Sequence, residues 1–347
     1  MGFYNKMMID NEDVQCVEVV AEVGNIHEGS VGLAGKMVEE IARSGADTVK
    51  FQTHFFEDES LDSAPNPVYF DSESRRSYFE RTALSKSAYE YLIQLSATLG
   101  IQFLSSPFSI RAVDFLLELG VKRLKIASGE VTNLQMLRYV SETGLPVLLS
   151  TGMSTLSEID AAVEALRSQK SINITIMQCT SMYPPADEDL GLNVIGLYKK
   201  RFDCSVGFSD HSRGFAAGVI AAWEGACIIE KHFTLSNKMY GSDAFNALEP
   251  DQMTQYVNQV KSASRIRMNP VDKDEMANKL SAMRTAFQKA IVTSKFVAAG
   301  ETLTLDHVTS KKPCMGISAD EIDMVVGRRV RCDLPKNSLI SWDLLSD

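Results

Sequence analysis

The stretch FDCSVGFSDHSRGFAAGVIAAWEGACIIEKH, residues 202–232, contains two short apolar runs that are each followed by a histidine. The runs Phe202–Phe208 and Ala226–Lys231 have the composition of β-strands, and the apolar segment between them is long enough for one helix. A strand, a helix and a second strand in this order indicate a βαβ unit with parallel strands. The residues that follow the two strands, His211 and His232, are therefore expected at the same edge of the sheet.

The same pattern occurs eight times, and each predicted strand ends at polar, chemically capable residues. The predicted strands are Val17–Val23, Thr48–Gln52, Ile101–Ser105, Arg123–Ala127, Pro146–Ser150, Ile172–Gln178, Phe202–Phe208 and Ala226–Lys231. Between most of them lie helical patterns with apolar residues at i, i+3 and i+4, such as Leu33–Ser44. Eight strand-helix units predict an α/β fold, the closed (β/α)8 or TIM barrel, whose reaction site collects the carboxyl ends of the strands. The protein is predicted to be an enzyme.

The chain of 347 residues exceeds one barrel of roughly 250 residues, so a second, small domain is expected. We assign 1–270 to the barrel, 271–285 to a linker and 286–347 to a β-rich domain too small for a generous core. The long polar and aromatic segment Phe55–Glu80 is predicted to be a lid or a helical excursion over the pocket. The β-like pieces of the small domain are Ala290–Ser294, Gly300–Thr304, Val308–Lys312, Val325–Arg331 and Ser338–Trp342.

The composition argues against several classes of protein. A formal net charge of −10 disfavours binding to nucleic acid or to an anionic membrane surface, because both need a basic footprint. The six cysteines show no C-x-x-C spacing and mostly lie in or beside apolar runs, as reduced thiols do. The segment Met1–Gln15 has no apolar region like that of a signal peptide. We therefore expect a soluble, cytoplasmic protein.

The two histidines that follow the last two strands are candidate metal ligands. Neighbouring strands lie about 4.8 Å apart, so His211 and His232 can share one cation. Two protein ligands leave most of the coordination sphere open, which suits a catalytic divalent metal, with Mn²⁺ favoured and Mg²⁺ or Co²⁺ as alternatives. Asp210 is a candidate to orient His211. The alternative is that each histidine only forms hydrogen bonds in the core. His27 and His54, in loops after the first two strands, are further candidates to approach a substrate.

Lys50 and Lys125 end the second and fourth predicted strands, and small hydroxyl residues accompany them. Ammonium and hydroxyl groups together suit a phosphate or a carboxylate. The alternative, which can coexist with ligand binding, is that each lysine pairs with a carboxylate such as Glu22 or Glu130. Either glutamate is also a candidate general acid or base. The hydroxyl residues are Ser106, Ser128, Ser150 and Thr151.

Motifs at the strand ends resemble, in order and over nearly the whole chain, those of the sialic acid synthase (N-acetylneuraminate synthase) family. In the barrel they are Ala21-Glu22-Val23-Gly24, Lys50-Phe51-Gln52-Thr53, Ser106-Pro107-Phe108, Lys125-Ile126-Ala127-Ser128-Gly129-Glu130, Ser150-Thr151-Gly152-Met153, Cys179-Thr180-Ser181-Met182-Tyr183-Pro184, Gly207-Phe208-Ser209-Asp210-His211 and Glu230-Lys231-His232-Phe233-Thr234. In the tail, Ala299-Gly300-Glu301 and Gly327-Arg328 look like the antifreeze-like SAF domain of that family.

The resemblance implies a metal-dependent condensation of phosphoenolpyruvate with N-acetylmannosamine and water, giving N-acetylneuraminate and phosphate. Synthesis of legionaminic or pseudaminic acid from a 2,4-diacetamido-trideoxyhexose is the alternative. Two further rivals are an enzyme that makes a 3-deoxy sugar acid from a phosphorylated sugar, and a catalytically silent sugar-binding protein. The resemblance also implies a domain-swapped homodimer in which each SAF domain covers the barrel mouth of its partner.

Carried over by motif, His211 and His232 hold the metal, and Glu22 and Glu130 serve proton transfer or positioning. The phosphoenolpyruvate contacts implied are Lys50, Ser106, Lys125, Ser128, Ser150, Ser181 and Ser209, and the sugar contacts are Gln52, Tyr183 and Asp243. Lys312 is a candidate substrate contact where the family has arginine. After Asp243 the chain reads Ala244-Phe245-Asn246 where many sialic acid synthases have His-Lys, which is closer to relatives that take deoxygenated sugars.

Overall fold

The computed structural model describes residues 16–66, 73–170, 172–241 and 243–346. The chain forms two compact units, Met1–Asn269 and Pro270–Asp347, and each is described by itself. Among the described residues, no helix combines the length and the apolar character that crossing a bilayer requires.

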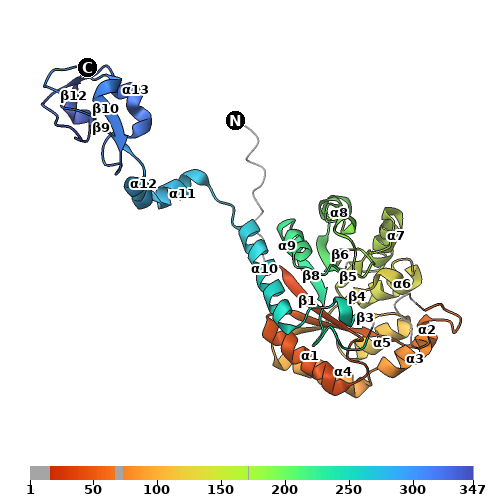
Figure 1. The fold of residues 1–347 in the computed structure, drawn as a ribbon. Helices are drawn as coiled ribbons and strands as arrows, with labels where there is room; N and C mark the ends of the chain where they lie inside the picture. The colour runs from red at the N-terminus through yellow and green to blue at the C-terminus, as the bar shows by residue number, and fades with distance from the viewer. Residues whose placement is uncertain (1–15, 67–72, 171, 242, 347) are drawn as a thin grey trace. The chain divides into compact units, whose positions relative to one another are not determined.

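The first unit is a closed barrel of eight parallel strands in sequence order (Figure 1). Strand β1 pairs with both β2 and β8, and this double pairing closes the sheet. The predicted (β/α)8 fold is therefore confirmed. The strands are β1 Glu18–Gly24, β2 Thr48–Thr53, β3 Gln102–Pro107, β4 Leu124–Ile126, β5 Val147–Ser150, β6 Ile174–Cys179, β7 Ser205–Asp210 and β8 Ile228–His232.

Helices surround the barrel and connect its strands (Figure 1). Several begin at a side chain that caps the first turn; the Ser30 hydroxyl, for example, accepts a hydrogen bond from the backbone N–H of Leu33. Two short helices after β2, α2 Phe56–Glu59 and α3 Arg75–Thr82, confirm the predicted helical excursion. The central part of this excursion lies outside the described residues. The remaining helices are α1 Val31–Ser44, α4 Lys86–Thr98, α5 Ile110–Glu118, α6 Leu134–Thr143, α7 Leu156–Leu166, α8 Val194–Phe202, α9 Ala216–Trp223 and α10 Pro250–Met268.

Most predicted strands agree with the structure to within two residues, but the seventh was wrong at its start. Phe202 is the last residue of α8, and its ring is buried against the barrel. Asp203 then takes a left-handed conformation with φ of 46° and ends the helix. An apolar residue at the end of a helix and one at the start of a strand look alike in sequence, so periodicity could not separate them.

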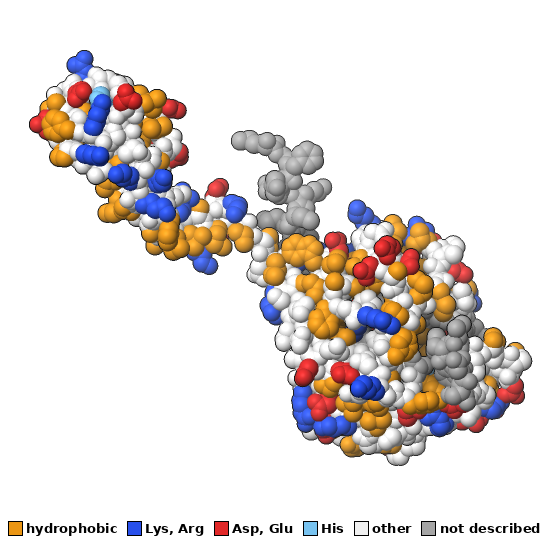
Figure 2. Space-filling view, viewed as in Figure 1, with side chains coloured by type: hydrophobic (Ala, Val, Ile, Leu, Met, Phe, Trp, Pro, Cys, Tyr) orange, Lys and Arg blue, Asp and Glu red, His pale blue; other side chains and the backbone are white. Residues whose placement is uncertain are grey.

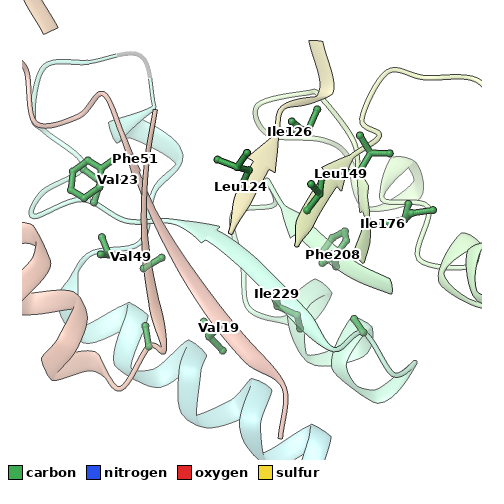
Figure 3. Close-up of a cluster of buried hydrophobic side chains, with 14 of the residues drawn as sticks. Val19, Val23, Val49, Phe51, Leu124, Ile126, Leu149, Ile176, Phe208 and Ile229 are labelled. Atoms are coloured by element: carbon green, nitrogen blue, oxygen red, sulfur yellow. The ribbon is translucent and has the colours of Figure 1, made fainter. Parts of the chain in front are cut away.

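Alternation along the strands divides the barrel into an outer and an inner layer. Outward side chains belong to the large apolar cluster that the strands share with the surrounding helices. Figure 3 shows the strand members Val19, Val23, Val49, Phe51, Leu124, Ile126, Leu149, Ile176, Phe208 and Ile229. A second, smaller apolar cluster forms a plug in the barrel interior from Val20, Leu104, Leu148, Met177 and Ile228. The inward positions nearer the carboxyl ends of the strands are polar, and they form the floor of the site.

The second unit is a small β-rich domain, as predicted, and two helices precede it. Helices α11 Lys273–Lys279 and α12 Ser281–Phe287 lie on either side of Leu280. The exposed apolar side chains of this segment include Leu280, Met283 and Phe287, and Figure 2 shows hydrophobic side chains gathered on it. Two antiparallel strand pairs follow, β9 Ala290–Thr293 with β10 Val308–Lys311, and β11 Arg329–Val330 with β12 Leu345–Ser346. Their core is Ile291, Val297, Leu303, Val308, Ile317, Val325, Val330, Leu334, Ile340 and Leu345.

The predicted strand Val325–Arg331 is shorter than expected. Helix α13 spans Ile322–Val325 and buries Val325 in the domain core. Gly327 then turns the chain with φ of 95°, a conformation that glycine adopts readily, so that strand pairing begins only at Arg329.

His27, in the loop after β1, is buried and held in its neutral form. It is 1% exposed, and its Nδ1 accepts a hydrogen bond from the backbone N–H of Gly29 at 3.1 Å. Burial lowers the pKa of His27 to about 4, from an ordinary value near 6.5. Between these two pH values the unfolded chain binds a proton at His27 that the folded chain does not bind.

We predict that this difference removes about 2 kcal/mol from the free energy of unfolding between pH 7 and pH 5. His27→Asn keeps an acceptor for the Gly29 N–H, because asparagine Oδ1 takes the place of Nδ1, and it removes the titration. Urea unfolding at both pH values is expected to show a smaller loss of stability for this variant than for the wild type. Equal losses in the two proteins would contradict the prediction.

Candidate active site

The polar inward residues open into a cavity of about 620 Å³ at the carboxyl ends of the strands. All fourteen site residues that the sequence predicts in the barrel line this cavity. They are Glu22, Lys50, Gln52, Ser106, Lys125, Ser128, Glu130, Ser150, Ser181, Tyr183, Ser209, His211, His232 and Asp243. The structure therefore brings together the histidine pair, the two amines and the acidic residues in one shared opening.

Four buried charges form the floor of the cavity. The Lys50 ammonium group lies 2.7 Å from Glu22 Oε2 and 3.6 Å from Glu230 Oε1. The Lys125 ammonium group lies 2.7 Å from Glu230 Oε2. Pairing of Lys50 with Glu22, which the sequence left open, is thus confirmed, whereas the partner of Lys125 is Glu230 and not Glu130. The four side chains balance one another in charge.

Glu230 is the residue of this cluster that sequence reasoning missed as a site residue. Burial raises the pKa of its carboxyl group, but the ammonium groups of Lys125 and Lys50 outweigh burial and hold the pKa at about 2. Burial lowers the pKa of Lys50, but the nearby carboxylates of Glu22 and Glu230 outweigh burial and raise the pKa above its ordinary value. Burial lowers the pKa of Lys125, which shares its carboxylate with Lys50. Strand alternation contained the signal, since Ile228, Glu230 and His232 all face inward from β8.

Small hydroxyl groups gather beside the lysines. The Ser106 hydroxyl accepts a hydrogen bond from the Lys50 ammonium group at 3.3 Å, and the Ser209 hydroxyl donates to Glu230 Oε1 at 3.1 Å. The backbone N–H of Gly152 donates to the Ser128 hydroxyl at 2.9 Å.

Gly152 keeps this group of hydroxyls open. A Cβ atom at this position would lie 2.3 Å from the Ser181 hydroxyl oxygen, 2.9 Å from the Ser128 hydroxyl oxygen and 2.9 Å from the Cys179 sulfur. Only glycine therefore lets these side chains approach one another. The cluster of N–H, O–H and ammonium groups is the donor set that a phosphate or carboxylate group needs.

The two histidines lie side by side above the charged floor, with ring centroids 5.6 Å apart. The Nδ1 atom of His211 lies 2.9 Å from the carbonyl oxygen of Thr180, so this nitrogen carries the proton and Nε2 is left for a ligand. The Tyr183 ring stacks on His211 with centroids 4.2 Å apart. Among the described residues, the buried Nδ1 atom of His232 has no hydrogen-bond partner, and Asp243 Oδ2 lies 4.0 Å from it.

The expectation that Asp210 orients His211 was wrong. Asp210 points outward from β7, because it precedes an inward residue, and it accepts a hydrogen bond from the Tyr256 hydroxyl at 2.8 Å. Its carboxylate also lies 3.2 Å from the Lys231 ammonium group and accepts from Ser212. The backbone carbonyl of Thr180 takes the orienting role instead, and a backbone contact of this kind leaves no mark in the sequence.

Acidic and amide groups surround the side of the cavity formed by the loops after β1, β2, β4 and β8. Gln52 Nε2 donates to Glu22 Oε1 at 2.9 Å. Glu130 accepts from Asn133 at 2.9 Å, and burial raises the pKa of its carboxyl group despite this bond. Ala244 is fully buried and does not line the cavity, and neither does Phe245, so these two residues do not shape it. Lys312 belongs to the second unit, where its ammonium group lies 5.2 Å from the centroid of the Phe287 ring.

The cavity has a shortage of positive charge. Its lining includes three cationic side chains, Lys50, Arg75 and Lys125, against five carboxylates, Glu22, Glu59, Glu130, Glu230 and Asp243. Among the described residues, no three histidine, cysteine, aspartate or glutamate side chains are grouped to hold a metal ion. The histidine pair, with one buried nitrogen unpaired, is the donor set that fits a cation sharing its remaining coordination positions with water or substrate.

Comparisons with known proteins agree with the resemblance read from the motifs. Residues 37–271 match the NeuB family, and residues 288–346 match the SAF domain. The N,N'-diacetyllegionaminic acid synthase of Campylobacter jejuni (serotype O:2) is 33% identical over 329 residues, which cover 93% of this chain and 98% of that protein. A pseudaminic acid synthase of Campylobacter jejuni (strain 81-176) is 31% identical over 324 residues, covering 92% of this chain and 93% of that protein.

A solved structure extends the likeness to three dimensions. The crystal structure of an N-acetylneuraminic acid synthetase from Leptospira borgpetersenii superposes with a TM-score of 0.68 and 28% sequence identity, over 80% of this chain and 97% of that chain. The match to the family covers more than half of the sequence and includes the strands that carry the histidine pair. The chain therefore belongs to the NeuB family, and its barrel is followed by a SAF domain.

Proposed function

We propose that this protein condenses phosphoenolpyruvate with an N-acetylated amino sugar and water, releasing phosphate and forming a nine-carbon 2-keto acid. The observation that carries the proposal is the convergence of two lysines, a cluster of hydroxyls and a histidine pair in one cavity. The names of the relatives, which are synthases of legionaminic, pseudaminic and N-acetylneuraminic acids, support it.

Phosphoenolpyruvate would occupy the lysine and hydroxyl end of the cavity. Lys50 and Lys125 would neutralise its anionic groups, and the hydroxyls around Gly152 would donate hydrogen bonds to them. C3 of the enol ester attacks the aldehyde carbon of the open-chain sugar, and positive charge develops at C2. Water adds at C2, and the tetrahedral product loses inorganic phosphate.

Two carboxyl groups are placed to move protons in this sequence. Glu22 lies beside the Lys50 ammonium group. Its carboxylate would accept the proton of the attacking water and would also stabilise the positive charge that develops at C2. Burial raises the pKa of Glu130, so this residue would hold a proton for the oxygen that develops from the aldehyde. His211 and His232 would hold a divalent cation, Mn²⁺ in our proposal with Mg²⁺ or Co²⁺ as alternatives. When bound, such a cation supplies a Lewis acid that polarises the sugar carbonyl.

The acceptor is proposed to be an unphosphorylated amino sugar. Glu59 and Asp243 lie in the cavity lining, and their negative charges would repel a second phosphate group. N-acetylmannosamine is the acceptor that the strand-end motifs imply. The second candidate is a 2,4-diacetamido-trideoxyhexose, which the identity of 33% to a legionaminic acid synthase favours.

A domain-swapped homodimer is part of the proposal. The exposed apolar side chains of α11 and α12 include Leu280, Met283 and Phe287, and a second copy would bury them. Lys312 would then be presented by the SAF domain to the barrel of the partner chain.

The acceptor can be identified by mass spectrometry of the product. Purified protein is incubated with phosphoenolpyruvate, Mn²⁺ and one acceptor at a time: N-acetylmannosamine, 2,4-diacetamido-trideoxymannose or its altrose epimer. We expect phosphate release and a nine-carbon keto acid with one of the three. Turnover of arabinose 5-phosphate in preference to all three would replace the proposal with the rival synthase of a 3-deoxy sugar acid.

Removing either histidine of the pair is expected to abolish cation-dependent turnover. Chelator-treated wild-type protein should lose activity and regain it with Mn²⁺, and Mn²⁺ should raise its thermal unfolding midpoint. His211→Ala and His232→Ala should show neither response, whereas His27→Asn, which alters a buried histidine outside the cavity, should show both. Full activity of either alanine variant after chelation would refute the cation assignment.

A single methyl group is expected to close the phosphate end of the site. Gly152→Ala would push the Ser128 and Ser181 hydroxyls apart, so we predict a rise of at least tenfold in the KM for phosphoenolpyruvate with little change in the KM for the sugar. Gly32→Ala is the matched control, since a Cβ atom there meets nothing within 4 Å. An unchanged KM for phosphoenolpyruvate in Gly152→Ala would place this substrate elsewhere.

A further inference from the structure

His54 lines the same cavity. Both of its ring nitrogens contact other side chains, so neither is free to exchange a proton with a substrate. Its ring is stacked between Phe79 and Phe108, each with a centroid distance of 4.1 Å. Its Nδ1 atom lies 2.9 Å and 3.1 Å from the two carboxylate oxygens of Glu59. Its Nε2 atom lies 3.1 Å from Gln52 Oε1. Both faces and both nitrogens of the ring are therefore in contact with other side chains.

These partners fix the orientation of the ring and the direction of one hydrogen bond. Gln52 faces His54 with its carbonyl oxygen, so Nε2 is the donor in this contact. The Glu59 carboxyl group holds the Nδ1 edge of the ring, and the two phenyl rings hold its faces. The imidazole therefore cannot rotate away from the Gln52 amide without losing these contacts.

The orientation of the Gln52 amide is set at its other end by Glu22. Gln52 Nε2 donates to Glu22 Oε1 at 2.9 Å, and the other oxygen of Glu22 lies 2.7 Å from the Lys50 ammonium group. The reverse orientation of the amide would place two oxygens at that distance with no proton between them. Only one orientation of the Gln52 amide therefore satisfies both of its neighbours: the oxygen faces His54 and the NH2 group faces Glu22.

We propose that His54 is a positioning residue that fixes the side-chain amide of Gln52 for recognition of the sugar. The identity of the substrate in this proposal rests on the proposed function, whereas the contact between His54 and Gln52 does not depend on it. With its oxygen held by His54, Gln52 presents its N–H groups to Glu22 and to the space above Gly24. A Cβ atom on Gly24 would lie 3.2 Å from Gln52 Nε2 and 3.3 Å from Asp243 Oδ2, so one donor and one acceptor converge on the same point.

This geometry makes Gln52 a selective contact. A freely rotating amide would present either an oxygen or an N–H group to the sugar, whereas the anchored amide presents only N–H. The sugar atom opposite it must then be an acceptor, such as a hydroxyl or an acetamido oxygen. Glu130 is a further acidic group near His54, on the strand-four side of the cavity.

The protonation state is tested without any turnover, by nitrogen NMR of protein labelled with ¹⁵N at its five histidines. The signals of His54 are those missing from His54→Phe, which keeps a ring between Phe79 and Phe108. We expect Nε2 of His54 to carry a proton in the wild type, as a donor to the Gln52 oxygen must. A ring whose Nε2 carries no proton would overturn the proposal.

The positioning role is tested by kinetics in a double-mutant cycle. His54→Phe is expected to raise the KM for the sugar about tenfold while the KM for phosphoenolpyruvate stays within twofold. Gln52→Met should raise the sugar KM at least as much, and adding His54→Phe to it should have no further effect, because His54 acts through the amide. Multiplicative effects, or an equal rise in the KM for phosphoenolpyruvate, would overturn the proposal.

The two tests separate this proposal from the proposed function. If the wild type turns over none of the amino sugars, the proposed function fails while the nitrogen signals still decide the state of His54. If His54→Phe does not fold, Glu59→Gln replaces it in the cycle, with a smaller expected rise in the sugar KM because the glutamine oxygen still accepts from Nδ1.

Discussion

Two ammonium groups buried in the interior of a barrel must be neutralised there, and the rest of the site depends on how this is done. Lys50 and Lys125 have only a few per cent of their surface exposed, and Glu22 and Glu230 lie within 2.7 Å of them. Unpaired, either amine would cost several kcal/mol or lose its proton. Because the four charges cancel, an anionic substrate must compete with Glu22 and Glu230 for the lysines, and additional positive charge is needed for it to bind. The histidine pair above the lysines is where a cation would provide that charge.

The alternation of side chains along β-strands explains which parts of the site the sequence could reveal. The fold and the residues at strand ends followed from apolar runs that stop at polar residues, and the fourteen predicted barrel residues share one cavity. The same alternation could have predicted Glu230 as a site residue, because it lies two residues before His232 on β8 and therefore also faces inward. Asp210 could not orient His211, because the alternation of side chains along β7 places it on the outer face of the strand, toward the helices. The carbonyl of Thr180 and the Phe108 ring come from loops, and the Phe79 ring comes from the short helix α3. No periodic pattern describes the paths of such connections.

The cavity has two ends of different chemistry. The lysine, serine and backbone N–H groups around Gly152 form an end rich in donors, and the carboxylates and amide after β1, β2, β4 and β8 form an end rich in acceptors. This division matches a reaction between an anionic enol ester and a neutral, hydroxyl-rich sugar. Within the acceptor-rich end, the anchored amide of Gln52 supplies a donor at one defined point. In the proposed recognition of the sugar, the direction of this donor depends on His54, which holds the oxygen of the amide.

The position of Glu230 on the last strand also affects how the chain folds during synthesis. Lys125 and its carboxylate are 105 residues apart in sequence, so the ribosome releases both lysines long before Glu230 emerges. A half-finished barrel would have to leave these amines in water, with the apolar faces of its strands uncovered. The interior can close only when β8 pairs with β1, which makes folding a late and cooperative event. A nascent chain that lacks β8 therefore exposes apolar surface, the condition under which folding intermediates aggregate.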